Sequence, residues 1–525
     1  MATPSNLPRV TYTNATADFT PLHDMLDKAI PEFRSKLGAT HPNFIGGKED
    51  SDGKPYKVVS PIDSQIEIGT FIAGTADSVT RAVAAARKAL PAWADIPWEK
   101  RNAMMKRMAD ALARRKYDLG IAAMIEVGKS RLEGIGEAEE AVDLCSYYVE
   151  EMERNKGFII PLKRSHPNEV TRSVLRPLGV FGVISPFNFP VALSTNMVSC
   201  ALVAGNTVVF HPTTNGALTG SMIVECAREA DAIGGVINII NGPGIGSKIV
   251  DAEGIDGIAF TGSYGVGMGI YRKYANGPYV RPVIAEMGGK NPAYVSEHAD
   301  LDAAAEGVMR SAFGLSGEKC SACSAVYVDK KVHKEFVDLL AAKTKKLKVG
   351  DPQERDVFMG PVVEKGSYEV FAKAAEDAKK DGGKIVTGGE RLKGGMFDRG
   401  YYCQPTVVDG LPRGHRLFSD ELFAPFIAVQ AFSDGLAAAI DEGNKVVYGL
   451  TAGVFSKKPE EVELFLNKAQ AGTLYANRRA NATAGAWPGY QAFGGWKGSG
   501  TTGKNGLGPR YLPLYMREQS HTIDG

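Results

Sequence analysis

Apolar side chains recur at helical spacing in two stretches of the first quarter of the chain. One face is formed by Val79, Val83, Ala86, Leu90 and Trp93. A second begins with Trp98, Met105, Met108 and Leu112. Such spacing predicts two amphipathic helices, and Asp77 is the expected N-cap of the first. Residues 1–40 show weak periodicity and are interpreted as an extension attached to the body of the protein.

Between residues 180 and 289 the pattern changes to short apolar runs that do not alternate with polar positions. Strands buried on both faces have this pattern, and the helix-like segments between the runs predict βαβ units and a parallel sheet. Gly, Pro, Ser, Thr or Asn closely follow most runs, at the strand ends where open α/β sheets bind ligands. The runs cover residues 180–184, 207–210, 236–240, 257–260 and 283–285.

A second α/β stretch follows at 301–474, with helices expected near 331–347, 365–380 and 458–469. No internal repeat or low-complexity linker separates the two stretches. The predicted fold class is therefore α/β, and the simplest architecture is two α/β lobes with a site between them.

Charge and composition narrow the class of protein. The 525 residues carry 61 basic and 60 acidic side chains, a formal charge of +1, which argues against bulk attraction to nucleic acid or to a membrane surface. The longest uncharged stretch, Pro177 to Val224, is interrupted by prolines and polar residues and predicts no membrane span. No secretory signal is visible, and six scattered cysteines fit a reducing compartment, so a cytoplasmic protein is expected.

The segment Gly317–Ser324 carries two of these cysteines, Cys320 and Cys323. A zinc half-site would need a second Cys or His pair, and no close pair exists elsewhere in the sequence. A thioredoxin-type redox pair, a pair of buried core thiols, and a catalytic nucleophile remain as further interpretations. A nucleophilic cysteine would require an activating base and an oxyanion donor from another part of the chain.

Candidates for those two roles follow predicted strands. Glu286 closes an apolar run ahead of a Gly-Gly pair, and Asn188 lies between two prolines that fix the backbone. Each has a plainer interpretation, a surface carboxylate for Glu286 and a helix cap for Asn188. Small residues at 261–263 open a helix, where backbone N–H groups favour phosphate. The glycine-rich stretch around Gly244 lacks GxGxxG spacing and is more simply a loop.

Taken together, six motifs in this order resemble the NAD(P)-dependent aldehyde dehydrogenase superfamily, from Asn43 over nearly the whole remaining chain. The separation of 34 positions between Glu286 and Cys320 (320 − 286) is the one expected for that family. The motifs are the Asn188 loop at 185–190, the Phe-Thr-Gly-Ser turn at 260–263, Glu286 with Gly288-Gly289-Lys290, Gly317 with Cys320, Glu421–Pro425, and the glycine-rich segment 493–500.

This resemblance implies a mechanism and a cofactor, NAD or NADP. Cys320 would attack the aldehyde, Asn188 and the Cys320 backbone N–H would stabilise the oxyanion, and Glu286 would activate water to release the acid. No metal is implied, and the expected partners are a small aldehyde and further copies of the chain, in a homodimer or higher homo-oligomer. The residues it assigns to the cofactor are Ser185, Pro186, Phe187, His211, Thr214, Gly244, Thr261, Gly262, Ser263, Glu421 and Phe423.

Within the superfamily the sequence is most similar to the 1-pyrroline-5-carboxylate (glutamate semialdehyde) dehydrogenases. In that subfamily a serine and two backbone amides hold the substrate α-carboxylate, which here implies Ser321, Gly485 and Ala486. Phe493 is assigned to the same substrate site. Glutamate 5-semialdehyde is therefore the expected substrate, with another aldehyde, aromatic or acid-tailed, as the alternative. A non-catalytic binding or structural role is the third hypothesis.

Several positions depart from the family pattern. Trp487 and Tyr490 stand in the carboxylate-binding loop, where they could pack as core or line a pocket for a bulkier aldehyde. Glu318 replaces the usual Gln before the nucleophile, and Ala492 replaces a Pro. His211 stands where a Lys is usual, and no carboxylate follows at Thr214, so both NAD and NADP remain open.

The resemblance also implies three structural parts. The cofactor domain would comprise 1–160 and 179–288, the catalytic domain 289–495, and a strand-rich oligomerisation flap 161–178 and 496–525. The polar alternating stretch 168–175 suits an exposed strand that pairs with a partner subunit, or a solvated edge strand.

Overall fold

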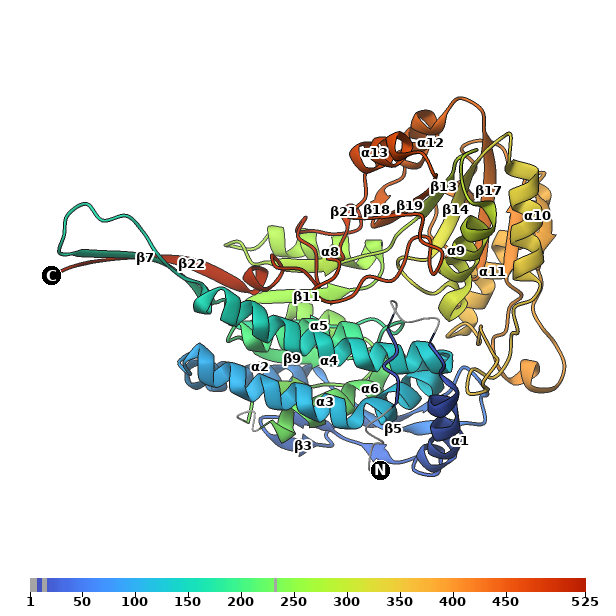
Figure 1. Cartoon of the computed structure of the whole chain (residues 1–525). Helices are drawn as coiled ribbons and strands as arrows, with labels where there is room; N and C mark the ends of the chain where they lie inside the picture. The colour runs from blue at the N-terminus through green and yellow to red at the C-terminus, as the bar shows by residue number, and fades with distance from the viewer. Residues whose placement is uncertain (1–6, 12–16, 231–233) are drawn as a thin grey trace.

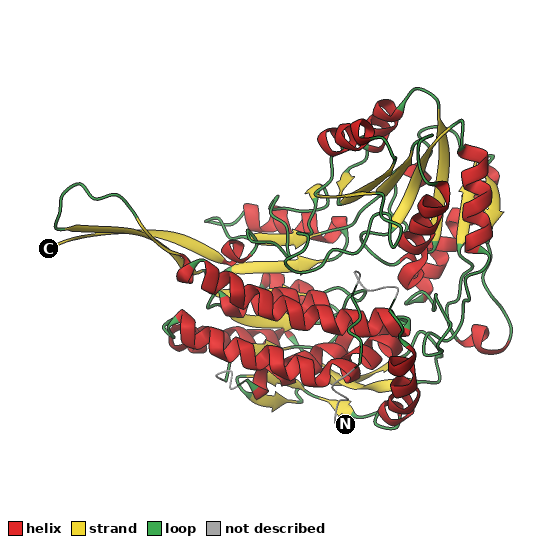
Figure 2. Ribbon diagram, in the orientation of Figure 1, coloured by secondary structure: helices red, strands yellow, loops and turns green. Residues whose placement is uncertain are grey.

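Two large sheets, each covered by helices, form the body of the protein, and a long two-stranded ribbon projects from it (Figures 1 and 2). The structure is a computed structural model that describes residues 7–11, 17–230 and 234–525. Between the sheets the chain passes directly from residue 286 at the end of one to residue 291 at the start of the other.

The first sheet contains the apolar runs predicted between 180 and 289. Within the described residues it has seven strands in the order β12-β11-β8-β9-β10-β2-β3. The five strands from β12 to β10 are parallel, as predicted, while β2 and β3 join antiparallel. Their bounds are β2 (Asn43–Ile45), β3 (Lys48–Asp50), β8 (Val180–Ile184), β9 (Thr207–His211), β10 (Ile237–Ile239), β11 (Gly257–Thr261) and β12 (Val283–Glu286).

Helices pack on both faces of this sheet, and long α3 and α4 lie side by side in the body (Figure 1). The predicted N-cap of α2 was wrong: Thr75, not Asp77, caps it, because Thr75 and Ser78 form a reciprocal capping box. The weakly periodic N-terminal region contains α1, whose buried Leu22 and Leu26 pack on α3. The helices are α1 (Thr20–Arg34), α2 (Ala76–Ala94), α3 (Trp98–Val127), α4 (Arg131–Arg154), α5 (Ala192–Val203), α6 (Ala217–Glu229), α7 (Ile245–Asp251) and α8 (Tyr264–Ala275).

The second sheet, also seven strands within the described chain, has the order β15-β16-β17-β14-β13-β19-β20, with β15 alone antiparallel. Its helices include the three predicted, and α11 matches its expected range residue for residue. Bounds are β13 (Asn291–Val295), β14 (Cys323–Asp329), β15 (Lys384–Thr387), β16 (Thr406–Asp409), β17 (Phe426–Phe432), β19 (Thr451–Phe455), β20 (Thr473–Ala476), α9 (Leu301–Phe313), α10 (His333–Thr344), α11 (Lys365–Lys380), α12 (Leu436–Gly443) and α13 (Pro459–Lys468).

Within the residues that the structure describes, three smaller sheets complete the fold. The predicted strand at 168–175 exists as β7 (Glu169–Pro177), but it is the central strand of an antiparallel sheet β22-β7-β6. The strands that expose an edge there are β6 (Ile159–Pro161) and β22 (Met516–Asp524), so β7 itself is not the edge strand. The other small sheets contain β1 (Thr40–His41), β4 (Lys54–Val59), β5 (Glu67–Ala73), β18 (Tyr448–Gly449) and β21 (Trp496–Lys497).

Candidate active site

The loop that carries Cys320 comes before β14, at the amino end of the second sheet. Leu315, Ser316 and Gly317 all have positive φ, at 46°, 52° and 71°. A side chain at Gly317 would lie 2.3 Å from the Ala424 carbonyl oxygen, so the close approach of the two loops requires glycine there. The strained turn leaves the Cys320 thiol half-buried rather than in the core.

Asn291, the first residue of β13, holds this loop in place. Its Nδ2 donates to the carbonyl oxygens of Cys320 and Ala322, at 2.7 and 2.9 Å, and its Oδ1 accepts from Thr451 N at 3.1 Å. The side chain is buried, so these bonds are shielded from water. The sequence reasoning missed Asn291. An amide at the start of an apolar strand, directly after the Gly-Gly-Lys motif, was the available signal.

The two cysteines of the Cys-x-x-Cys segment occupy different environments. Burial first, then the carboxylates of Glu421 and Glu286, raise the pKa of the Cys320 thiol to about 12. Cys323 is 1% exposed, and its Sγ lies 3.7 Å from the Ala325 carbonyl oxygen as a weak donor. Among the described residues, no cluster of His, Cys, Asp or Glu could hold a metal ion. Cys323 therefore fits the core-thiol interpretation, and Cys320 is the thiol placed for chemistry.

Asn188 and Glu286 approach this thiol from the first sheet. Asn188 does not cap α5; instead its Nδ2 donates to the Glu318 carbonyl oxygen at 3.0 Å, two residues before Cys320. Glu286 ends β12, and its Oε2 accepts from Gly495 N at 3.0 Å. Burial raises the pKa of Glu286 well above its usual range, although the Gly495 N–H opposes this shift. The structure thus brings all three predicted catalytic residues to one place.

The two segments assigned to a substrate carboxylate, at Ser321 and at 485–486, are linked by the side chain of Thr483, which the sequence analysis did not single out. Thr483 is fully buried, and its Oγ1 donates to the Ser321 carbonyl oxygen at 2.7 Å. Gly485 has a φ of 98°, and its carbonyl accepts from Arg478 Nη2 at 2.7 Å. The 484–487 loop, with Ala486, is thereby fixed beside the nucleophile loop. Phe493 lies partly buried against the core of the first lobe.

The two aromatic departures have opposite environments. Trp487 is 5% exposed, and its indole Nε1 donates to Asp143 Oδ2 on α4 at 2.8 Å. Tyr490 is 81% exposed, so the interpretation of this ring as core was wrong.

Glu318, the departure before the nucleophile, is fully buried and accepts from Val363 N with both carboxylate oxygens, at 3.2 and 3.1 Å. Burial raises its pKa to about 8. The next residue, Lys319, pairs with Glu133 of α4 at 2.7 Å. The nucleophile loop is therefore anchored on both sides, toward α4 and toward the start of α11.

The residues assigned to the adenosine end of a cofactor lie at the carboxyl ends of neighbouring strands β8 and β9. Ser185 N donates to the His211 carbonyl oxygen at 3.2 Å. His211 is buried, which lowers its pKa to about 4, and its Nδ1–H donates to the Ile240 carbonyl oxygen at 2.9 Å. The imidazole is therefore neutral, with Nε2 as an acceptor. Nearby, Gly244 caps α7 with a φ of 74°, and Thr214 opens a short helical turn.

The residues assigned to the phosphate and nicotinamide ends lie around the carboxyl ends of β11 and β12. Ser263 caps α8, accepting from Val266 N, and Gly262 N donates to the Glu286 carbonyl oxygen at 3.1 Å. Thr261 Oγ1 lies 3.7 Å from Met197 Sδ. Glu421 accepts from Gly289 N at 2.8 Å, and a side chain at Gly288 would lie 1.9 Å from its Oε2. Pro186 precedes Phe187, whose ring packs edge-on against Phe423 at 5.8 Å.

These features fit a dinucleotide. The α8 N-terminus offers backbone N–H groups and a positive dipole end to phosphate, and Glu421 and the neutral His211 offer acceptors to ribose hydroxyls. Gly288 leaves room for the Glu421 carboxylate, which a Cβ would displace. The cradle therefore suits a nicotinamide dinucleotide, and the imidazole of His211 is itself not a cation for a 2′-phosphate.

Comparisons with known proteins agree with this geometry. The aldehyde dehydrogenase family model matches residues 48–520. A 1-pyrroline-5-carboxylate dehydrogenase of Geobacillus sp. (strain WCH70) is 34% identical over 500 residues, covering 94% of this chain and 95% of the relative. An alpha-ketoglutaric semialdehyde dehydrogenase of Bacillus subtilis (strain 168) is 36% identical over 465 residues, covering 88% and 93%.

The solved structures show the same fold. A Thermus 1-pyrroline-5-carboxylate dehydrogenase with bound NAD superposes with a TM-score of 0.92 at 31% identity, covering 100% of both chains. The resemblance drawn from six motifs is thus confirmed, and the chain belongs to the aldehyde dehydrogenase family.

Proposed function

We propose that this protein oxidises L-glutamate 5-semialdehyde to glutamate with NAD or NADP, through a cysteine thioester. The observation that supports the substrate assignment is the bond from Thr483 Oγ1 to the Ser321 carbonyl oxygen, at 2.7 Å. It joins the segment that leads into Gly485 and Ala486 to the segment that carries Ser321 and Cys320. Hydroxyl and amide donors suit a carboxylate. Relatives named for 1-pyrroline-5-carboxylate support the same substrate.

The proposed first step is attack of the Cys320 thiolate on the aldehyde carbon, forming a C–S bond and an oxyanion. One Asn188 N–H donates to the Glu318 carbonyl oxygen, and the second N–H of the same amide is the proposed donor to the oxyanion. The Cys320 backbone N–H is the other proposed donor. Each such donor typically lowers the barrier by about 3–4 kcal/mol.

A dinucleotide held by these residues would supply the two-electron acceptor for the hydride that the adduct carbon loses as it becomes a thioester. Glu286 then accepts a proton from water, the water oxygen attacks the thioester carbonyl, and the C–S bond breaks to return the thiolate. Its raised pKa makes Glu286 a stronger base than an ordinary carboxylate once it has lost its proton. Glu421 and Ser263 are proposed to hold the nicotinamide ribose and the phosphates.

A second acid-tailed aldehyde deserves the same assay, because the Bacillus subtilis relative at 36% identity is named for alpha-ketoglutaric semialdehyde. The two substrates share a carboxylate and differ in the adjacent amino or oxo group. The aromatic alternative has less support, because the Trp487 indole is turned to Asp143 of α4.

Oligomeric state, domain limits and location belong to the same proposal. The projecting β7–β22 ribbon is proposed to pair with a partner subunit through the edge of β22 or β6, giving a homodimer or higher oligomer. We also propose domain limits at 1–160 with 179–288, at 289–495, and at 161–178 with 496–525. Six free cysteines support a reducing, cytoplasmic location. No helix of the described chain is long and apolar enough to cross a membrane.

The test is a panel of aldehydes with purified protein, followed by NADH or NADPH absorbance. Glutamate 5-semialdehyde should give a kcat/KM at least about tenfold above propanal and benzaldehyde. A preference for benzaldehyde would overturn the substrate assignment. A preference for alpha-ketoglutaric semialdehyde would move it to the second candidate.

A further inference from the structure

Asp143 of α4 is shared by two segments that are far apart in the sequence. It accepts from the Trp487 indole at 2.8 Å, and both of its oxygens accept from Arg9 Nη2 at 2.9 Å. Arg9 Nε also donates to Glu139, one helical turn earlier on α4, at 3.0 Å. An N-terminal arm, residues 7–11, is thus fastened to the same carboxylate as the loop that is proposed to bind the substrate carboxylate.

Packing brings the arm close to α4 at the same place. Val10 is 7% exposed, and a side chain at Gly136 would lie 3.4 Å from Val10 Cγ1. The glycine on α4 therefore allows the arm to lie directly on the helix. This contact is apolar and buried, so it stabilises the arm independently of the ion pairs.

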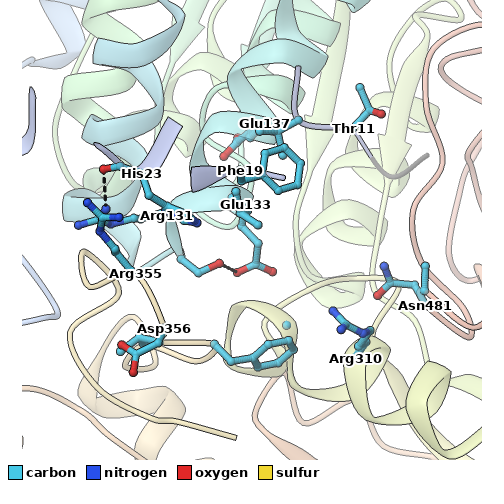
Figure 3. A pocket seen from close by; sticks show the side chains of 18 of the residues that line it. Thr11, Phe19, His23, Arg131, Glu133, Glu137, Arg310, Arg355, Asp356 and Asn481 are labelled. Carbon is cyan, nitrogen blue, oxygen red and sulfur yellow. Dashed lines mark hydrogen bonds between the residues drawn. The ribbon is translucent and has the colours of Figure 1, made fainter. Parts of the chain in front are cut away.

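A cavity of about 310 Å³ lies between the arm, α4 and the carboxylate-binding loop. Val10 and Thr11 of the arm, Glu133 and Glu137 of α4, and Trp487 all line it. Figure 3 shows Thr11, Glu133 and Glu137 around this space, with Asn481 of the loop across from them. Lys319, the neighbour of the nucleophile, also lines the cavity. The arm and the carboxylate-binding loop therefore line one cavity that extends to the residue next to Cys320.

We propose that Trp487, Asp143 and Arg9 act as positioning residues that hold the 484–487 loop for the carboxylate of the substrate. The proposal rests on the proposed function, since it assigns that loop to carboxylate binding. Arg478 fixes the Gly485 carbonyl from one side, and the indole bond fixes the loop from the other. Loss of the indole bond leaves the Gly485 and Ala486 amides less well aligned for a carboxylate, while Cys320 keeps its own anchors at Asn291 and Glu318.

The experiment compares glutamate 5-semialdehyde with propanal, which has no carboxylate, for Trp487→Phe and Arg9→Gln. Trp487→Phe should raise KM for the semialdehyde about fivefold, with kcat for both aldehydes and KM for propanal unchanged. Arg9→Gln should give a smaller increase, about twofold, because the ion pair is exposed. An Arg9→Gln, Asp143→Asn double variant should raise KM by less than the product of the two single effects, since the two changes share the Arg9–Asp143 contact.

Two variants serve as controls. Glu150→Gln removes a carboxylate from an exposed position of α4, and Arg34→Gln removes a guanidinium from the exposed face of α1. Both should leave KM unchanged.

A wild-type protein that prefers propanal would overturn the proposed substrate and the carboxylate role with it. A wild-type preference for the semialdehyde that survives Trp487→Phe and Arg9→Gln with equal KM would overturn the positioning role alone. A parallel rise in KM for propanal would also overturn it.

Discussion

The two large sheets contribute to the site from opposite ends. In the first, Ser185, His211 and Glu286 lie at or just after the carboxyl ends of parallel strands. In the second, Cys320 and Asn291 lie at the amino ends, before or at the first residue of β14 and β13. The chain crosses from one edge to the other within residues 286–291, so the two edges meet at Glu286 and Cys320.

The difference shows how each edge is held in place. At the carboxyl edge the strands and the following helix starts place the residues, with backbone bonds such as Gly262 N to the Glu286 carbonyl. At the amino edge the loop is irregular, and side chains must hold it: Asn291, Thr483 and Glu318 each bond to the backbone of another segment. The nucleophile is therefore more sensitive to single side-chain changes than the cofactor residues are.

The largest expected effect is at the nucleophile itself. Cys320→Ala should lower kcat by about 10⁴-fold or more, because no other thiol can form the thioester. The matched change Cys323→Ala removes a buried thiol three residues further along the chain, at the start of β14, and should retain most activity, with a small loss of stability. Steady-state rates for both variants check this. Comparable activity in the two variants would contradict the assignment of the nucleophile.

Asn291→Ala tests whether the amino edge of the second sheet is more sensitive to side-chain loss than the first sheet. It removes three buried hydrogen bonds, so we expect a loss of about 3 kcal/mol in unfolding free energy and about 10²-fold in kcat.

Asn238→Ala is the matched change in the first sheet, where the side chain also makes three bonds, to Val208, Gly235 and Gly46. It should cost similar stability and leave kcat of the folded enzyme within about threefold. Thermal unfolding and steady-state kinetics test the pair. Equal losses of kcat would show that the amino edge has no special sensitivity.

Activity should rise with pH. Burial and neighbouring carboxylates raise the pKa of Cys320 to about 12, and burial raises that of Glu286. Both groups act in their deprotonated forms, so each loses its proton as pH increases, and kcat/KM should increase steadily between about pH 6.5 and 9. A pH profile that is flat across this range would contradict the raised values.

Glu318→Gln should stabilise the protein in a pH-dependent way. Burial raises the folded-state pKa of Glu318 to about 8, from 4.5 in the unfolded chain, so folding requires Glu318 to take up a proton at higher pH, and stability falls as pH rises between these values. The Gln variant does not titrate. Its gain in unfolding free energy should be about 1 kcal/mol at pH 5 and about 4 kcal/mol at pH 8. Exposed Glu150→Gln should show no gain at either pH.

The smallest effect is expected at His211. A lysine there would place an ammonium beside the adenosine ribose, where the wild type has a neutral imidazole. His211→Lys should increase affinity for NADPH about threefold more than for NADH. Fluorescence titration of the reduced cofactors measures this directly. Equal changes for both would indicate that His211 does not face the 2′ position.

The sequence predicted the carboxyl edge better than the amino edge, for a physical reason. Buried parallel strands leave a clear apolar pattern, and their ends mark ligand positions, so Glu286, Asn188 and Ser263 could be singled out. Asn291 and Thr483 work through contacts with residues 29 and 162 positions away, which no local pattern records. Tyr490 was misjudged as core because aromatic composition does not distinguish a buried ring from an exposed one.

Residues near the C-terminal end of the sequence contribute hydrogen bonds around Glu286. Gly495, which donates to its carboxylate, is 209 residues further on, and Ser499 and Thr501 add further bonds to the same edge. Contacts of such long sequence separation form late in folding, and large α/β proteins fold lobe by lobe. During refolding, helical signal should therefore return before catalytic turnover, because an otherwise folded first lobe still lacks the segment that encloses its base.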